Sequence, residues 1–197
     1  MELIDKLLAE IGEDKCDNFS TTSFKFKKDL WEFFQGFDDK IAVEFGTHKG
    51  QTTKILSHLF KKVYTVNRND NETAINFNKD RENIIYVNNF NLYDESLKLP
   101  IEEEVDMFLI DAGHEYEHII YDINRVTRMS KSSECYVVFD DYGLARWQHS
   151  VNRGVNEAIS MDILKVIKEI GHSSGHIFDT TNNRHLIHSE GLITKYI

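Results

Sequence analysis

The sequence predicts a single α/β domain built around a mostly parallel sheet. Between about residues 41 and 141, short apolar runs rich in Val, Ile and Phe alternate with amphipathic segments of helical periodicity. Each pair of successive strands is then joined by a crossover helix, which makes the strands parallel and brings their carboxyl ends to one edge. With 197 residues, the chain has the length of one domain with a full core.

Residues 1–37 are predicted to form N-terminal helices. Apolar residues recur at helical spacing from Leu3 to Ile11. A second helix is expected to run through several aromatic residues, which pack toward the core, and to end near Gly36. The candidates for its N-cap are Thr21, Thr22 and Ser23.

Residues 38–145 are predicted to form the ligand-binding half of the domain. The expected strands are IAVEF, KVYTV, IIYV, VDMFLI and CYVVF. Helices are expected over TTKILSHLF, around residues 72–80 and over EYEHIIYDINRV.

Residues 146–197 are predicted to hold one long helix, over about residues 151–170, followed by strands. The sequences GHIFDT, RHLIHS and GLITKYI read as strands joined by turns near residues 181–184 and 190–191. These connections are too short for crossover helices, so at least one antiparallel pair is expected at the C-terminal edge of the sheet.

The charge of the chain argues against nucleic acid and membranes as partners. A formal net charge of −10 repels phosphate backbones and anionic lipids. The nearest approach to a basic patch is Lys25, Lys27 and Lys28, which are expected on the solvent-exposed face of a helix. The acidic start of the chain does not resemble a signal peptide, and no apolar run has the length of a bilayer span, so a cytoplasmic location is expected. Cys16 and Cys135 are not expected to pair.

Polar residues follow several of the predicted strands directly. In an open parallel sheet, ligands bind beyond the carboxyl ends of the strands. A series of such residues therefore predicts a binding site better than any one of them, since a single Asp at a strand end is also common where the chain meets water. The residues are Glu44, Asn67, Asp111, Asp140 and Asp141.

The loop VEFGTHKGQTT is the most specific feature of this edge. Gly46 allows a tight turn, and Gly50 lets the following helix approach the strand. The G-x-G-x-x-G pattern of dinucleotide-binding loops is absent. Glu44 at the loop entrance would bind an ammonium or hydroxyl group and would oppose a pyrophosphate. The loop at residues 44–50 thus favours a zwitterionic, nucleoside-bearing ligand over NAD.

Three segments together carry a family resemblance. VEFGTHKGQTT, VDMFLIDAGHEYEHIIYDI and VVFDDYG occur in this order within about residues 38–145. The chain resembles the class I S-adenosylmethionine-dependent methyltransferases, and in particular a small bacterial and phage-type group. The resemblance implies a Rossmann-like, doubly wound, seven-stranded sheet with an antiparallel C-terminal edge. It also implies S-adenosylmethionine as the cofactor.

The resemblance assigns roles to individual residues. The family often has acidic residues at the positions of Asn67, for the ribose hydroxyls, and Asn89, for the adenine amine. Neutral amides bind more weakly there, because charge-assisted hydrogen bonds are roughly twice as strong. Asp111 is expected to serve both cofactor binding and catalysis. The residues expected around the methionine end of the cofactor are Glu44, Gly46, Thr47 and Gly50.

A second group of residues is predicted to bind the acceptor. Asp111, Asp140 and Asp141 offer the oxygen ligands that Mg²⁺ prefers. The segment resembles metal-dependent O-methyltransferases, which implies a divalent cation that binds and orients the acceptor. The alternative is that Asp140 and Asp141 cap a turn. His114 is a candidate for the catalytic residue that takes the acceptor proton, with a surface histidine as the alternative.

Three functions follow from these observations. The first is O-methylation of a small molecule or a sugar hydroxyl, in a chain that is expected to form a homodimer. The second is a cofactor-binding protein that has lost catalysis, which Asn67 and Asn89 would explain. The third is a zinc hydrolase, because HEYEH (residues 114–118) matches the H-E-x-x-H pattern. Its weakness is that His114 directly follows a strand and is expected at the entrance of the helix.

Overall fold

The computed structural model describes residues 2–12, 14, 21–130, 134–179 and 184–197. Within these residues the strands are β1 (Ile41–Phe45), β2 (Lys62–Val66), β3 (Ile84–Val87), β4 (Met107–Ile110), β5 (Tyr136–Phe139), β6 (Leu164–Asp179) and β7 (Arg184–Tyr196). The helices are α1 (Leu3–Ile11), α2 (Phe24–Phe33), α3 (Gln51–Leu59), α4 (Glu72–Phe77), α5 (Tyr116–Met129) and α6 (Arg153–Ser160). Short turns of 3-10 helix (Ala145–Trp147) and π-helix (Gln148–Asn152) precede α6.

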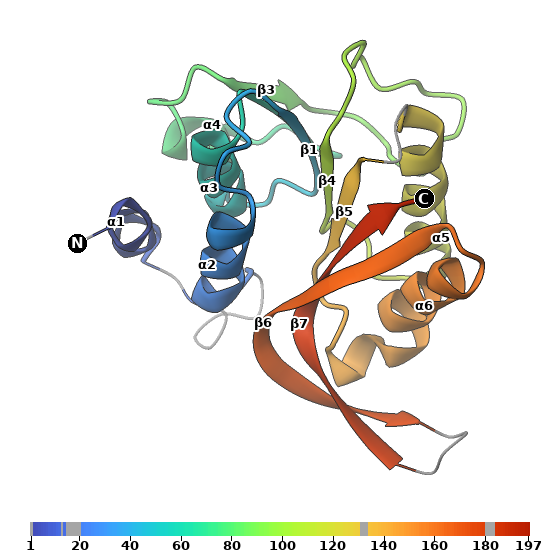
Figure 1. Ribbon diagram of the computed structural model, residues 1–197. Helices are drawn as coiled ribbons and strands as arrows, with labels where there is room; N and C mark the ends of the chain where they lie inside the picture. Colours follow the sequence, from blue (N-terminus) through green and yellow to red (C-terminus); the bar gives the residue numbers. More distant parts are fainter. Residues whose placement is uncertain (1, 13, 15–20, 131–133, 180–183) are drawn as a thin grey trace.

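The strands form one seven-stranded sheet in the order β3-β2-β1-β4-β5-β7-β6 (Figure 1). The first five are parallel, whereas β7 is antiparallel to both β5 and β6. The order reverses between β1 and β4, where two crossovers leave in opposite directions. This is the point at which an open α/β sheet binds ligands. The predicted Rossmann-like fold with an antiparallel C-terminal edge is therefore confirmed.

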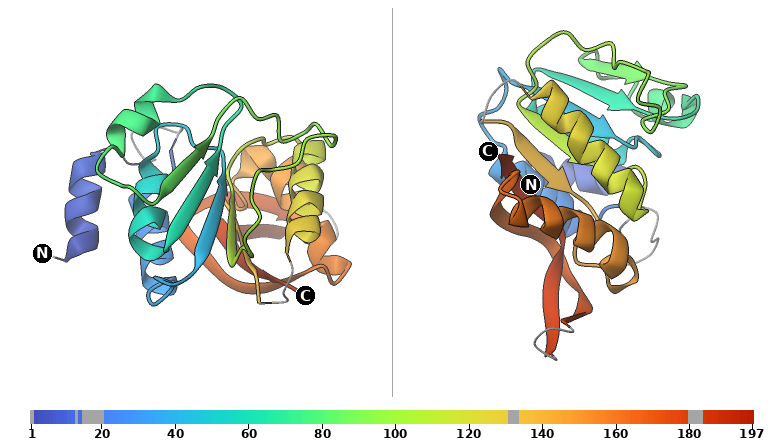
Figure 2. Two further views of the ribbon diagram at one scale, coloured as in Figure 1. Left: turned by 90° about the horizontal axis from the view of Figure 1, so that it is seen from above. Right: turned by 90° about the vertical axis from the view of Figure 1, so that its right-hand side faces the viewer.

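Helices cover both faces of the sheet, as Figure 2 shows. One face packs on α5 and α6 through residues such as Phe108, Ile123 and Val155. The other packs on α1, α2 and α3 through residues such as Leu30 and Ile55. Neighbouring strand residues point to opposite faces, which explains why the strands read as continuous apolar runs. Among the described helices, none is both long and apolar enough to cross a membrane.

The second helix begins where the sequence predicts. Ser23 is its N-cap, and the Ser23 hydroxyl accepts a hydrogen bond from the Phe26 amide at 3.0 Å. At the other end, Phe34 is fully buried and packs edge-on against Phe37 and Tyr136. The prediction that the aromatic residues of this segment pack inward is confirmed for these positions.

The prediction for the C-terminal quarter is wrong in two respects. The long helix over residues 151–170 ends at Ser160, and β6 begins at Leu164. Asp162, with φ of 56°, breaks the helix. The apolar residues that follow fit a helix as well as a strand, and pairing with β7 decides between them.

The turn predicted at residues 190–191 is absent. RHLIHS and GLITKYI belong to one continuous strand, in which Gly191 pairs with Ile170. The segment GHIFDT forms the end of β6 as far as Asp179, and the connection at 180–183 lies outside the described residues. Cys135 is buried with a free thiol, and Cys16 also lies outside the described residues.

Candidate active site

Gly46 brings the β1 loop against the end of β4. Its φ of 98° lies in the region that favours glycine. A Cβ at this position would lie 1.9 Å from the backbone oxygen of Asp111, so no other side chain fits. The Gly46 amide donates to the Val66 carbonyl at 3.0 Å, which fixes the loop to β2 as well. The loop is therefore anchored on both sides of the point where the strand order reverses.

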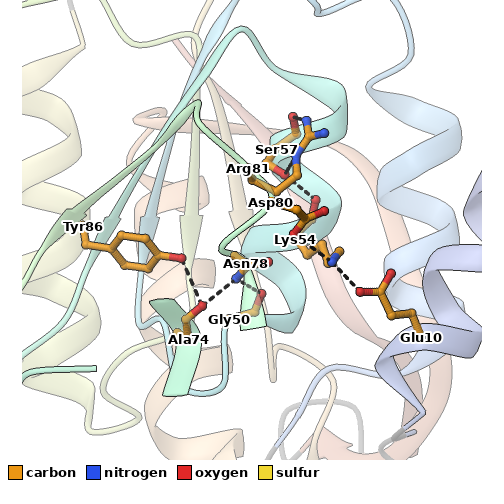
Figure 3. Close-up of polar contacts among 9 residues, drawn as sticks. All are labelled: Glu10, Gly50, Lys54, Ser57, Ala74, Asn78, Asp80, Arg81 and Tyr86. Atoms are coloured by element: carbon orange, nitrogen blue, oxygen red, sulfur yellow. Dashed lines mark hydrogen bonds and ion pairs between the residues drawn. The ribbon is translucent and has the colours of Figure 1, made fainter. Parts of the chain in front are cut away.

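Gly50 is held at the start of α3 by a buried asparagine (Figure 3). Asn78 donates its side-chain amide to the carbonyls of Gly50, at 2.9 Å, and Ala74, at 3.1 Å. A Cβ at Gly50 would lie 2.5 Å from that amide nitrogen. Because φ is 75° at Gly50, the predicted need for glycine is confirmed at both ends of the loop.

Glu44 is a buried carboxyl at the end of β1, with 1% of its surface exposed. It accepts hydrogen bonds from the hydroxyls of Thr53, at 2.5 Å, and Thr65, at 2.6 Å. Burial raises the pKa of Glu44 to about 7, and the two hydroxyls and the positive charge of Lys27 limit that rise. A cationic ligand group beside Glu44 would favour the charged carboxylate.

Three adjoining hollows run along the carboxyl ends of the strands. A narrow cleft of about 20 Å³ reaches Glu44 and Gly46, and it shares Thr21, His48 and Asp111 with a cavity of about 250 Å³. That cavity shares Ala112 with a third hollow of about 270 Å³ on the β2 and β3 side.

His114 faces the 250 Å³ cavity and is held on two sides. Its Nε2 lies 2.8 Å from the Asp141 carboxylate, and its ring stacks on Trp147 with centroids 4.7 Å apart. Asp141, the second residue after β5, has a φ of 59°. Asp111 and Asp140 line the same cavity. The structure thus brings His114 together with the three predicted aspartates.

The structure gives no support for the predicted magnesium ion. Asp141 is engaged by His114, and no group of three or more His, Cys, Asp or Glu in the described part of the chain is arranged to hold a metal. Mg²⁺ requires near-octahedral oxygen ligands, which the His114–Asp141 pair does not provide. The predicted triad of Asp111, Asp140 and Asp141 therefore gains no support from the structure.

The HEYEH segment is not arranged as a zinc site. His114 precedes α5, which begins at Tyr116. His118 lies on the first turn of α5 and stacks on Tyr93, with ring centroids 3.9 Å apart. The two histidines have different neighbours, and His118 lines the third hollow instead.

The two asparagines that were predicted to contact the nucleoside differ in position. Asn67 lines the third hollow, and its side chain donates to the Asn69 carbonyl at 2.9 Å. Asn89 is exposed, does not line that hollow and donates to the Asp70 carboxylate at 2.8 Å. The apolar lining comes from Val66, Phe90 and Leu92. Of the two predicted contacts, the structure places only Asn67 at the hollow.

Lys27 is a buried residue of the site that sequence reasoning missed. Its ammonium donates to the Thr22 carbonyl and lies 3.4 Å from the Thr21 hydroxyl. Burial lowers the pKa of Lys27 to about 8, and the charges of Glu190, Asp140 and Asp111 oppose that change. The prediction of a solvent-exposed lysine is wrong here, because Lys27 shares a helix face with Leu30 and Phe34. The sequence signal for its burial was the spacing of Lys27 from Leu30 and Phe34, which are three and seven residues further along the chain.

Comparisons with known proteins agree with this geometry. A family model described as a methyltransferase domain matches residues 43–142, half of the chain. A mimivirus protein, uncharacterized protein R132 of Acanthamoeba polyphaga mimivirus, is 27% identical over 138 residues. That match covers 62% of this chain and 61% of the viral protein, so the chain spans less than two thirds of its relative.

Solved structures share the fold at low identity. The O-methyltransferase TomG from Streptomyces achromogenes, in complex with SAM, superposes with a TM-score of 0.69 and 15% identity, covering 100% of this chain and 90% of TomG. The tRNA (m1A58) methyltransferase TrmI from Aquifex aeolicus superposes with a TM-score of 0.64 and 17% identity, covering 99% of this chain and 76% of TrmI. At this identity the likeness concerns the fold.

Proposed function

This chain belongs to the methyltransferase domain family, and from that membership we propose that it transfers a methyl group from S-adenosylmethionine to a hydroxyl group of a small molecule. The observation that carries the proposal is the buried carboxyl of Glu44 inside a glycine loop, at one end of a row of three hollows. A dinucleotide would bring its pyrophosphate against this carboxyl. A cofactor with an ammonium group would instead neutralise it.

The residues present fit S-adenosylmethionine. Glu44 would hold the ammonium, and the amides between Gly46 and Gly50, at the start of α3, would hold the carboxylate. Asn67 would bind the ribose, and the apolar hollow between Val66 and Phe90 would take the adenine. When bound, the cofactor supplies a methyl group activated by its sulfonium charge.

We assign His114 as the residue that takes the proton from the acceptor hydroxyl. Its imidazole lines the 250 Å³ cavity, while Asp141 and Trp147 fix its orientation. The Asp141 carboxylate stabilises the imidazolium that forms when His114 takes a proton. Asp111 lies between this cavity and the Glu44 cleft, so it would contact both the acceptor and the cofactor. No step of this mechanism is assigned to a metal.

The second candidate function is cofactor binding without turnover. It is favoured by the neutral Asn67 and the exposed Asn89 at positions where the resemblance implies acidic residues. TomG is an O-methyltransferase and TrmI a tRNA (m1A58) methyltransferase by name, so the hydroxyl acceptor is proposed from the His114–Asp141 pair in the cavity and not from these names. A homodimer and a cytoplasmic location stay predictions.

Calorimetry with S-adenosylmethionine and S-adenosylhomocysteine tests the cofactor assignment. Both should bind, and NAD, as the control ligand, should not. A protein that binds NAD but neither of the other two would contradict the proposal. Release of S-adenosylhomocysteine with a panel of hydroxyl and amine compounds then tests turnover. Product formed only with hydroxyl compounds is expected, and tight binding without any product would favour the second candidate.

A further inference from the structure

Lys27 lies where the acidic active site needs a positive charge. Asp111 and Asp140 line the cavity and Glu44 lies in the adjoining cleft, and the charges of all three act on the Lys27 ammonium, with Glu190 as its largest opposite charge. The ammonium itself lies 3.4 Å from Thr21, which lines both hollows. A buried charge in this position is retained only where opposite charges compensate it.

A hydrogen-bonded network connects this lysine to the turn that carries the aspartates. Ser23, at the start of the same helix, donates both its amide, at 2.9 Å, and its hydroxyl to the buried Glu190. The Glu190 carbonyl accepts from the amide of Gly143, two residues after Asp141, at 3.3 Å. The position of Lys27 is thus coupled to the position of the aspartates.

We propose that the buried ammonium of Lys27, and not a divalent cation, compensates the charge of Asp111 and Asp140 and positions the acceptor site. This inference rests on the proposed methyltransferase function. Lys27 is a positioning residue, since it does not line the cavity itself. It acts on the cavity through its contact with Thr21 and through its charge. Because no metal has to be chelated, the acceptor needs only one nucleophilic oxygen, and the His114–Asp141 pair takes its proton.

The chain offers a matched control in Lys54. This lysine is also buried, and it pairs with Glu10 at 2.5 Å and with Asp80 at 3.3 Å, on the outer side of α3 (Figure 3). Neither of these carboxylates lines the active-site hollows. Lys54→Met therefore removes a buried ammonium without changing the charge of the site.

The test is Mg²⁺ binding, measured by calorimetry and by the unfolding temperature of the full chain with increasing MgCl₂. The wild type, Lys27→Arg and Lys54→Met should not respond to millimolar Mg²⁺. Lys27→Met should gain a response, with an unfolding temperature that rises with Mg²⁺, because its aspartates have lost their cation. Stoichiometric Mg²⁺ binding by the wild type, or a Lys27→Met variant that behaves like Lys54→Met, would overturn the inference.

The outcome remains decisive if Lys27→Met does not fold. Mg²⁺ binding by the wild type or by Lys27→Arg then overturns the inference, and its absence in both supports it. S-adenosylhomocysteine binding by the wild type is measured in the same samples with Mg²⁺ and with EDTA. Loss of that binding in both buffers would refute the cofactor assignment, whereas binding that requires Mg²⁺ would refute only the role of Lys27.

Discussion

The two ends of the proposed cofactor site are built differently. At the end near Glu44, the glycine loop is fixed by backbone hydrogen bonds, by the hydroxyls of Thr53 and Thr65 and by the amide of Asn78. At the nucleoside end, Asn67 and Asn89 are partly or fully exposed, and they bond to neighbouring loop residues.

This difference indicates which end of the site is preorganised for ligand binding. The polar groups around Glu44 are already oriented and shielded from water, so a cationic group gains a charge-assisted bond without reorganising the protein. The asparagines have to exchange existing hydrogen bonds for new ones, so their net contribution to the free energy of binding is small. We therefore expect changes near Glu44 to have larger effects than changes at Asn67.

The largest effect is expected from Gly46→Ala. The new Cβ would lie 1.9 Å from the Asp111 oxygen at a φ of 98°, so β1 and β4 must separate. Strain and overpacking together should cost about 3–5 kcal/mol of the free energy of unfolding, measured by urea denaturation. Gly36→Ala is the control, because Gly36 also has a positive φ, of 86°, but open space around it. Its cost should be only about 1–2 kcal/mol, and equal losses would contradict the steric argument.

The pH dependence of stability should be the next largest effect. The pKa of Glu44 is about 7 in the folded protein, against 4.5 for its ordinary value. The folded state therefore binds this proton more tightly, so the contribution of Glu44 to stability is complete below about pH 4.5 and decreases as the pH rises through 7. By linkage the loss is on the order of 3 kcal/mol.

Glu44→Gln should remove this pH dependence. Its unfolding free energy should exceed that of the wild type by an amount that increases from about pH 5 to about pH 8, because this range covers most of the interval between the two pKa values of Glu44. Glu103→Gln is the control at the opposite end of β2, where hydrogen bonds from Lys62 and Tyr64 lower the pKa of Glu103 to about 2. A parallel pH profile for the wild type and Glu44→Gln would show that Glu44 titrates normally.

The same variant should weaken ligand binding. Glu44→Gln keeps an oxygen that can accept from Thr53 and Thr65 but loses the charge that would pair with the cofactor ammonium. Calorimetry at pH 8, about one unit above the pKa of Glu44, should show a loss of about 1–3 kcal/mol in S-adenosylhomocysteine binding. In the wild type, binding should strengthen as the pH rises through 7, the opposite direction to stability. Unchanged affinity would place the ligand elsewhere.

How much of the site could be predicted from the sequence depends on the range of the interactions. Gly46 and Gly50 were predictable, because a tight strand-to-helix turn is a local requirement. The strand-end positions of Glu44 and Asp111 followed from alternating apolar runs. The burial of Lys27 was not predicted, because it depends on the packing of α2 against β6.

The C-terminal errors have the same origin. The segment from Leu164 to Ile170 fits either a helix or a strand by periodicity, and its pairing with residues 191–196 determines the outcome. The pairing of His114 with Asp141 likewise joins two loops that are distant in sequence. Aspartates at strand ends suggest a metal when the sequence is considered alone, and the pairing of Asp141 with His114 becomes visible only in the structure.

The smallest effect should come from Asn67→Asp, which tests the weaker end of the site. Asp at this position would accept charge-assisted hydrogen bonds from ribose hydroxyls, and it would lose the existing bond to the Asn69 carbonyl. S-adenosylhomocysteine affinity should increase by about 0.5–1 kcal/mol. Asn69→Asp is the control, since it adds the same charge to the same exposed loop outside the hollow. An equal gain in both variants would indicate a general electrostatic effect, whereas a gain in Asn67→Asp alone would locate the ribose and show that this end of the site is weak because it lacks a carboxylate.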